Sequence, residues 1–89
     1  MNAKHNIAND KHRIAFDGNS GSEQWGYPLN LPISRPGLMS IGEKIHEGMA
    51  VVIVEKGEFE LDATLTFVEE YGYWKAIPIE GTLKLLRED

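Results

Sequence analysis

Residues 49–68, MAVVIVEKGEFELDATLTFV, decide the fold of this chain. The run Ala50–Val54 is apolar and rich in β-branched residues, which is typical of a strand covered on both faces. After Lys56 and Gly57 the pattern changes to a strict alternation, which places one apolar set on a single face: Phe59, Leu61, Ala63, Leu65 and Phe67. The pattern predicts two antiparallel strands joined by a tight hairpin at Gly57.

Two more strands are predicted after this hairpin, each introduced by a turn glycine. Gly72 precedes the strand 73–78 and Gly81 precedes the strand 82–87. Within these strands the alternation points Trp74 inward, and it lets Leu83 and Leu85 complete the core. Pro78 lacks a backbone donor and is expected at a sheet edge or barrel rim.

These strands predict an all-β fold, a small antiparallel meander of four to five strands. A flat sheet would leave one apolar face in water, and burial of each such side chain contributes roughly 1.5–3 kcal/mol. Closure into a small barrel removes this exposure. The long second strand, with the small Ala63 at its middle, is able to bend and serve two half-sheets.

The segment Tyr71-Gly-Tyr-Trp-Lys-Ala76 resembles the part of SH3-like barrels in which an aromatic pair follows a polar turn. The resemblance spans residues 48–87 and implies an SH3-like barrel. The aromatic-acidic loop and the Pro-Ser-Asn-Tyr ending of eukaryotic SH3 domains are absent. The resemblance therefore implies a fold and not the binding of proline-rich peptides.

The chain divides into an irregular or flexible N-terminal extension, residues 1–37, and a barrel domain, residues 38–89. The extension holds Pro28, Pro32 and Pro36 among several glycines, a composition that favours turns. A short strand is expected within 11–16, with Asp17 and Gly18 as its turn. The apolar residues of 25–33 are expected to dock on a sheet edge or on a partner.

Residues 38–48 have two interpretations. Ser40 and Glu43 have the spacing of a capping box and Gly48 suits a C-terminal cap, which predicts one or two helical turns. Gly42 opposes this because an interior helical glycine costs about 1 kcal/mol against alanine. We favour an irregular first strand that leads into Gly48.

Size and charge restrict the function. Eighty-nine residues form one small domain, and the absence of cysteine excludes disulfides and thiolate metal sites. The apolar run at 49–54 is far shorter than the ~20 residues of a membrane helix, and the start of the chain does not resemble a signal peptide, so a cytoplasmic protein is expected. Residues 1–48 carry five basic and five acidic side chains, whereas residues 49–89 carry four basic and nine acidic ones. The net charge of −5 therefore belongs to the strand-rich half and disfavours nucleic acid as a partner.

No catalytic or cofactor motif is found in the sequence, and no metal site is expected. The loop 18–22 lacks the second glycine of a nucleophile elbow. His5, His12 and Asp10 lie in the extension, without the fixed surroundings that a metal site requires. The acidic row Glu58, Glu60 and Asp62 is expected to be a solvated face that deters edge-to-edge pairing of sheets.

Aromatic residues are the best candidates for a binding surface, because Tyr and Trp carry much of the binding energy at protein interfaces. The predicted partner-binding residues are Tyr71, Tyr73, Trp74, Trp25 and Tyr27. In a second interpretation Trp74 is a core residue and the tyrosines pack beside it. We expect a non-enzymatic protein-binding or regulatory module that contacts another protein or a second copy. The alternatives are binding of single-stranded nucleic acid or oligosaccharide by an aromatic barrel face, and a role as accessory subunit of an enzyme.

Overall fold

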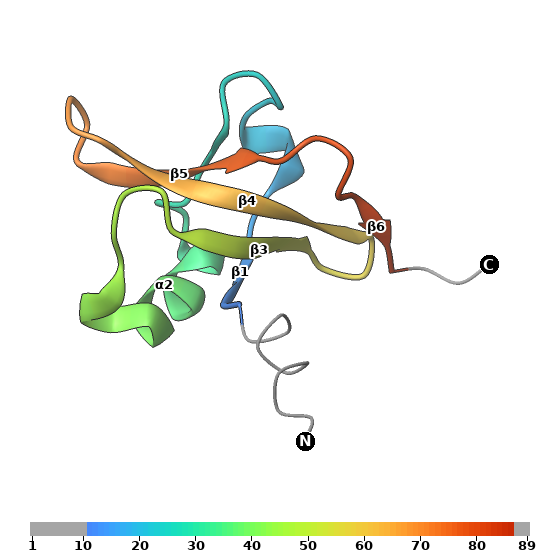
Figure 1. The fold of residues 1–89 in the computed structure, drawn as a ribbon, viewed down its shortest axis with the longest axis horizontal. Coiled ribbons are helices and arrows are strands. Elements are labelled where there is room, and N and C mark those ends of the chain that lie inside the picture. The colour runs from blue at the N-terminus through green and yellow to red at the C-terminus, as the bar shows by residue number, and fades with distance from the viewer. Residues whose placement is uncertain (1–10, 87–89) are drawn as a thin grey trace.

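A computed structural model describes residues 11–86 and shows one curled mixed sheet that forms an open half-barrel (Figure 1). The strands are β1 (Arg13–Ala15), β2 (Tyr27–Pro28), β3 (Ala50–Glu55), β4 (Phe59–Val68), β5 (Tyr73–Pro78) and β6 (Lys84–Leu85). The helical elements are η1 (Gly18–Ser20), η2 (Pro32–Ser34), α2 (Arg35–Ile41) and η3 (Gly42–Lys44). The predicted mostly-β class is confirmed.

The meander β3–β4–β5 follows the predicted pattern. Both pairs are antiparallel, with Ile53 opposite Leu61 and Leu65 opposite Ala76. The glycines of the three turns have positive φ angles, 76° at Gly57, 74° at Gly72 and 85° at Gly81. Figure 1 shows these three strands side by side across the molecule, with α2 at one end and β6 at the other.

The long strand β4 pairs with β3 on one edge and with two partners, β5 and β6, on the other. Its second half pairs with β5, and its first two residues pair with β6. β6 therefore lies beside the start of β4, beyond the end of β5, and it is only two residues long. The prediction that Leu83 and Leu85 complete the core is wrong. Leu83 and Leu85 are 57% and 69% exposed, because β6 is a two-residue strand at the edge of the sheet that pairs with β4 alone among the described strands.

Residues 11–37 supply both outer strands of the sheet. β1, inside the short strand predicted for 11–16, pairs with β3 in parallel, so that the sheet is mixed and not a pure antiparallel meander. β2 pairs with β5 in antiparallel fashion, which confirms that the segment 25–33 docks on a sheet edge. The segment between them places Asp17 at the start of η1, where its Oδ1 accepts a hydrogen bond from the Asn19 amide at 2.9 Å.

The core lies on the concave face of the half-barrel and joins both parts of the chain. Residues 11–37 contribute three of its buried side chains, Ile14, Phe16 and Leu29. The helix α2 adds Ile41 at one end. The meander contributes the largest share, which consists of Val51, Ile53, Leu61, Ala63, Leu65 and Ala76. The inward-facing members of β4 are those that the alternation predicts, although Phe67 is exposed near the end of the strand.

The preference for a strand over residues 38–48 is wrong. The helix α2 begins earlier than either interpretation assumed, with Pro36 in its first turn, and it ends at Gly42, which has a φ of 65°. The capping box does not form, because Ser40 lies near the end of the helix and its Oγ donates to the Gly37 carbonyl at 2.8 Å. Gly42 is the cap of a short helix and not an interior residue, so its helix penalty does not apply.

The convex face of the sheet carries two ion pairs that the sequence analysis did not predict. Lys11 Nζ lies 3.3 Å from Asp62 Oδ2, and Arg13 pairs with Glu60. Both bases precede or lie within β1, and both acids lie on β4. The prediction that this acidic row faces only solvent is therefore wrong for Glu60 and Asp62. Partly exposed pairs of this kind contribute little stability, but they offset charge where β1 joins the meander.

Ser34 is a buried polar residue whose replacement should destabilise the fold. Its side chain is fully buried, and Oγ donates to the Ala15 carbonyl at 2.6 Å. Ser34→Ala removes the donor and leaves a β1 carbonyl without this bond in an apolar site, so we expect a loss of about 1–3 kcal/mol in the free energy of unfolding. The exposed Ser40→Ala is the matched control, with an expected change within about 0.5 kcal/mol. Equal urea midpoints for both variants would contradict this role of Ser34.

Candidate functional site

The five predicted partner-binding residues fall into two groups. The first group reaches solvent in part. Tyr71 lies in the β4–β5 hairpin, Tyr73 lies on the convex face of β5, and Trp25 lies on the loop before β2. Tyr27 and Trp74 pack against the core on the concave face. Tyr71 and Trp25 are therefore exposed and Tyr73 is half-buried, whereas Tyr27 and Trp74 are partly buried against the core.

Tyr71 and Tyr73 form a stacked pair at the β4–β5 hairpin, named here the tyrosine pair. Their ring centroids are 6.0 Å apart and their planes differ by 12°. The turn holds the two rings together, since the amides of Tyr71 and Gly72 both donate to the Val68 carbonyl, at 3.1 and 2.7 Å. Tyr71 is 67% exposed, so one face of an ordered aromatic stack is open to solvent.

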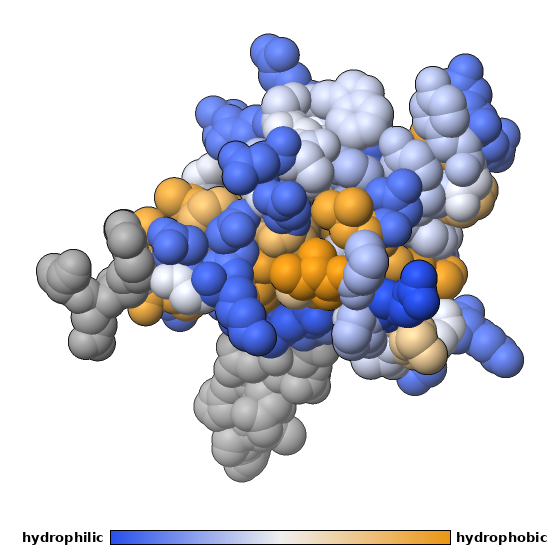
Figure 2. All heavy atoms as spheres, turned by 180° about the vertical axis from the view of Figure 1, so that it is seen from behind, coloured by the Kyte–Doolittle hydropathy of each residue, from blue (hydrophilic) through white to orange (hydrophobic). Residues whose placement is uncertain are grey.

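Acidic side chains border the tyrosine pair. Glu69 and Glu70 precede Tyr71 in the turn, and both are exposed. The hairpin projects at the upper left of Figure 1, and Figure 2 shows it from behind at the upper right, as a knob of pale and strongly hydrophilic side chains. An aromatic surface beside two carboxylates suits a partner that carries positive charge.

Trp25 lies on the loop Ser22–Gly26, which is closed by two backbone hydrogen bonds. Ser22 and Gly26 exchange amide-to-carbonyl bonds of 3.2 and 2.7 Å, and the Trp25 amide donates to Ser22 Oγ at 3.0 Å. The ammonium of Lys75 lies 4.2 Å from the centroid of the indole ring, within cation–π range. Trp25 therefore already has a cationic neighbour from β5.

Tyr27 and Trp74 serve the core. The Tyr27 ring meets Phe16 edge to face with centroids 4.9 Å apart, and Trp74 meets Phe67 at 5.1 Å. The core interpretation of Trp74 is confirmed. The Phe16–Tyr27 contact brings the residue that follows β1 against β2, so side chains connect the two outer strands of the open half-barrel.

Burial raises the pKa of the Tyr27 hydroxyl, and the negative charges of Glu23 and Glu55 raise it further. The folded state therefore favours the neutral phenol more strongly than the unfolded state does. The stability that the neutral Tyr27 side chain contributes is complete below the ordinary tyrosine pKa of about 10, and it is lost as pH rises above that value. We expect Tyr27→Phe to lose less stability than the native chain between pH 9 and 11. Urea unfolding at a series of pH values measures this, and identical pH profiles would contradict it.

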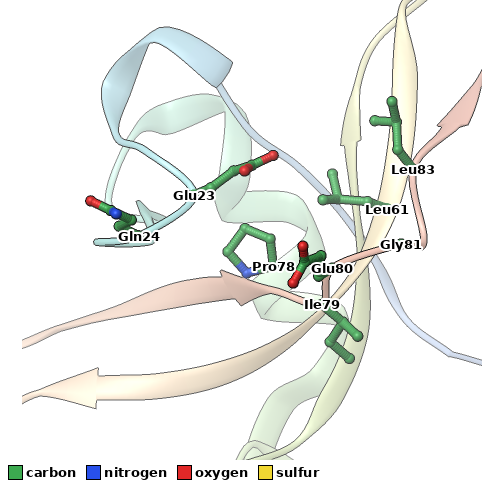
Figure 3. Close-up of a pocket in the computed structure, with 8 residues that line it drawn as sticks. All are labelled: Glu23, Gln24, Leu61, Pro78, Ile79, Glu80, Gly81 and Leu83. Carbon is green, nitrogen blue, oxygen red and sulfur yellow. The ribbon is translucent and has the colours of Figure 1, made fainter.

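A pocket of about 440 Å³ opens at the other end of β5, and the sequence analysis did not predict it. Figure 3 shows Glu23, on the loop Ser22–Gly26, at one side of the pocket, and Pro78 and Glu80, which end β5 and follow it, at another. Leu61 of β4, with Leu83, supplies further apolar wall. The only feature of the sequence that points to this region is Pro78, whose missing backbone donor predicts a position at a sheet edge or barrel rim. The pocket itself requires the loop 22–26 to dock, and local sequence does not show this.

Residues 11–86 contain no group of three or more His, Asp or Glu side chains arranged to hold a metal ion, and His5 and Asp10 lie outside these residues. Within the same range, no helix has the length and apolar character needed to cross a membrane. Comparisons of the chain with protein-family models, with curated proteins and with solved structures gave no significant match.

Proposed function

We propose that this protein is a non-enzymatic protein-binding module and that the tyrosine pair is its contact surface. The observation that carries the proposal is the exposure of Tyr71 in a ring stack that the hairpin already orders. The proposed partner is a segment of another protein with basic residues, or with proline beside them. Glu69 and Glu70 provide the complementary charge.

Physical arguments support an aromatic pair as a binding surface. Tyrosine offers a large contact area with few rotatable bonds, so little conformational entropy is lost on binding. The stack reduces this loss further because the neighbouring ring already restricts Tyr71. The acidic surroundings and the net charge of −5 favour a basic polypeptide and disfavour nucleic acid.

Self-association is the second form of this proposal, and the end of β6 favours it. Leu83 and Leu85 are exposed beside each other, and Ile79 is exposed on the approach to them. Figure 2 shows hydrophobic surface at the left, the side on which β6 lies when the view of Figure 1 is reversed. Exposed apolar surface of this kind marks interaction sites in many proteins.

The same proposal includes a likeness to SH3-like barrels and a cytoplasmic location. The curled sheet and the two partners of β4 support the likeness, since small barrels also bend a long strand between two half-sheets. The binding mode is not carried over from SH3 domains, because the residues that identify their peptide groove are absent.

Site-specific photocrosslinking in cells tests the proposal. A photoreactive phenylalanine analogue replaces Tyr71 in one version of the full chain and Met39 in another. Met39 is the control because it is 71% exposed and lies on α2, away from the hairpin. We expect a covalent adduct with a discrete partner from position 71 and none from position 39. An adduct of twice the 10.0 kDa chain mass identifies self-association.

The contrary outcome is equally well defined. If position 71 gives no adduct while the variant chain remains folded, or if both positions give the same adducts, the tyrosine pair is not a specific contact surface. Far-ultraviolet circular dichroism of the variants establishes that the fold is retained. Tyr73 provides a second position on the same stack.

A further inference from the structure

The pocket at the end of β5 is the strongest feature that the tyrosine pair does not explain. Its volume of about 440 Å³ lies within the range of small-ligand sites, about 300–1,000 Å³. Three segments build it: the loop Ser22–Gly26, the first half of β4, and the connection from β5 to β6. Because these segments are distant in sequence, the pocket is a product of the tertiary fold.

The lining combines apolar walls with negative charge. Leu61, Pro78 and Leu83 supply the apolar surface, and Glu23 and Glu80 supply the charge. None of the described residues that line the pocket is basic. Among residues 11–86, neither carboxylate forms a salt bridge or accepts a side-chain hydrogen bond. Two carboxylates therefore face one hollow without a cation.

We propose that this pocket receives a lysine or arginine side chain of the partner that binds the tyrosine pair, an inference that rests on the proposed function. Such a side chain carries an apolar stem and a charged end. The stem packs on Pro78 and Leu61, and the charged end lies near Glu23 and Glu80 (Figure 3). The lining and the proposed occupant thus match along the whole length of the side chain.

Other occupants fit the pocket less well. An anionic group would be repelled by both carboxylates, and an apolar group would remove water from them without replacing their charge partners. The charge of Glu23 already acts on its surroundings, since it contributes to the raised pKa of Tyr27. The local field is therefore negative on the loop side of the pocket.

The positions of the two surfaces restrict the partner segment. Tyr73 begins β5 and Pro78 ends it. At a rise of about 3.4 Å per residue the strand separates them by about 17 Å. Because the two positions are five residues apart in one strand, their side chains lie on opposite faces of the sheet, so a partner that contacts both surfaces reaches around the sheet and does not run along β5.

Titration of the isotopically labelled full chain with a model compound tests the pocket without any partner. The probe is N-acetyl-lysine N-methylamide, and the matched control is its norleucine counterpart, which has the apolar stem and no charge. The amide signals of Leu61, Glu80 and Gly81 are the reporters. We expect saturable shifts at these positions, with a Kd on the order of millimolar for the lysine probe and at least about fivefold weaker binding for the norleucine probe.

Variants assign the charge preference to its residues. The double variant Glu23→Gln/Glu80→Gln should weaken binding of the lysine probe about three- to tenfold. The control Glu43→Gln/Glu47→Gln removes the same charge from exposed positions on or just after η3, outside both proposed surfaces, and should leave the affinity unchanged. Equal affinity of the two probes, an unchanged affinity in the pocket variant, or no saturable shift overturns the inference.

The result is separate from the test of the proposed function. If crosslinking at position 71 succeeds and the lysine probe does not bind the pocket, the pocket inference fails and the tyrosine surface stands. If the probe binds and position 71 gives no adduct, the pocket binds cations but the proposed contact surface is wrong. The two experiments share no variant.

Discussion

Phe16→Ala should remove a large part of the stability of the fold. Phe16 is 1% exposed, and its ring contacts Tyr27 at 4.9 Å and Phe59 at 6.0 Å between centroids. Truncation of a buried phenylalanine costs about 3–5 kcal/mol, because apolar burial is lost and a cavity remains. Small domains have total stabilities of about 0.05–0.15 kcal/mol per residue, so a loss of this size is a large fraction of the whole. Urea unfolding followed by tryptophan fluorescence measures it.

Phe67→Ala is the matched control for this variant. It removes the same atoms from β4, but Phe67 is exposed and has one described ring partner, Trp74. We expect a loss of about 1–2 kcal/mol, since an aromatic pair contributes about 0.5–1.5 kcal/mol beyond its buried area. If Phe16→Ala were no more destabilising than Phe67→Ala, residues 11–37 would not share the core of the meander.

Gly37→Val should destabilise the protein by about 3 kcal/mol, because α2 lies directly against β1. A Cβ atom at position 37 would lie 2.9 Å from both the Arg13 carbonyl oxygen and Ile14 Cα. Both are backbone atoms of a paired strand, so they cannot rotate away from the added side chain. Valine has a better helix propensity than glycine, but this gain is only a few tenths of a kcal/mol and cannot offset the overlap. Thermal unfolding by circular dichroism provides the measurement.

Met39→Val is the control for the helix effect. Met39 lies two residues further along α2 and is 71% exposed, so the same valine has room. The expected change is within about 0.5 kcal/mol, the size of the propensity difference. A Gly37→Val variant as stable as Met39→Val would show that α2 is not held against the strand.

The meander could be predicted from sequence because its signals are local. The alternation in β4 selects Leu61, Ala63 and Leu65 as inward residues, and all three are buried. The small Ala63 correctly marked the region where β4 exchanges one partner for the other. Both signals depend on neighbouring residues in one strand, where backbone geometry sets the pattern.

The partners of β1 and β6 could not be predicted, because strand pairing depends on distant segments. A three-residue strand such as Arg13–Ala15 carries no mark of its direction relative to β3. Leu83 alternates with Lys84 as a core residue would, but the chain places it beyond the cover of the half-barrel. Alternation shows that two side chains share a face and does not show whether that face is covered.

Some parts of the candidate site could likewise be predicted from the sequence, and others could not. Tyr71 is one of the predicted partner-binding residues, and it is 67% exposed at the β4–β5 hairpin. The alternation already indicated an inward Trp74, and the contact with Phe67 shows where it packs. The pocket joins Glu23 and Glu80 across 57 residues of sequence, and no local pattern connects them.

Residues 11–37 form both outer strands of the half-barrel and provide one wall of the pocket. Amide hydrogen exchange tests this claim. The Phe16 amide donates to the Val54 carbonyl at 3.0 Å, and the Leu29 amide donates to the Trp74 carbonyl at 2.9 Å. We predict protection at both amides within about tenfold of that at Leu65 in β4, because one cooperative unit opens together. Rapid exchange at Phe16 and Leu29, with Leu65 still protected, would contradict the claim.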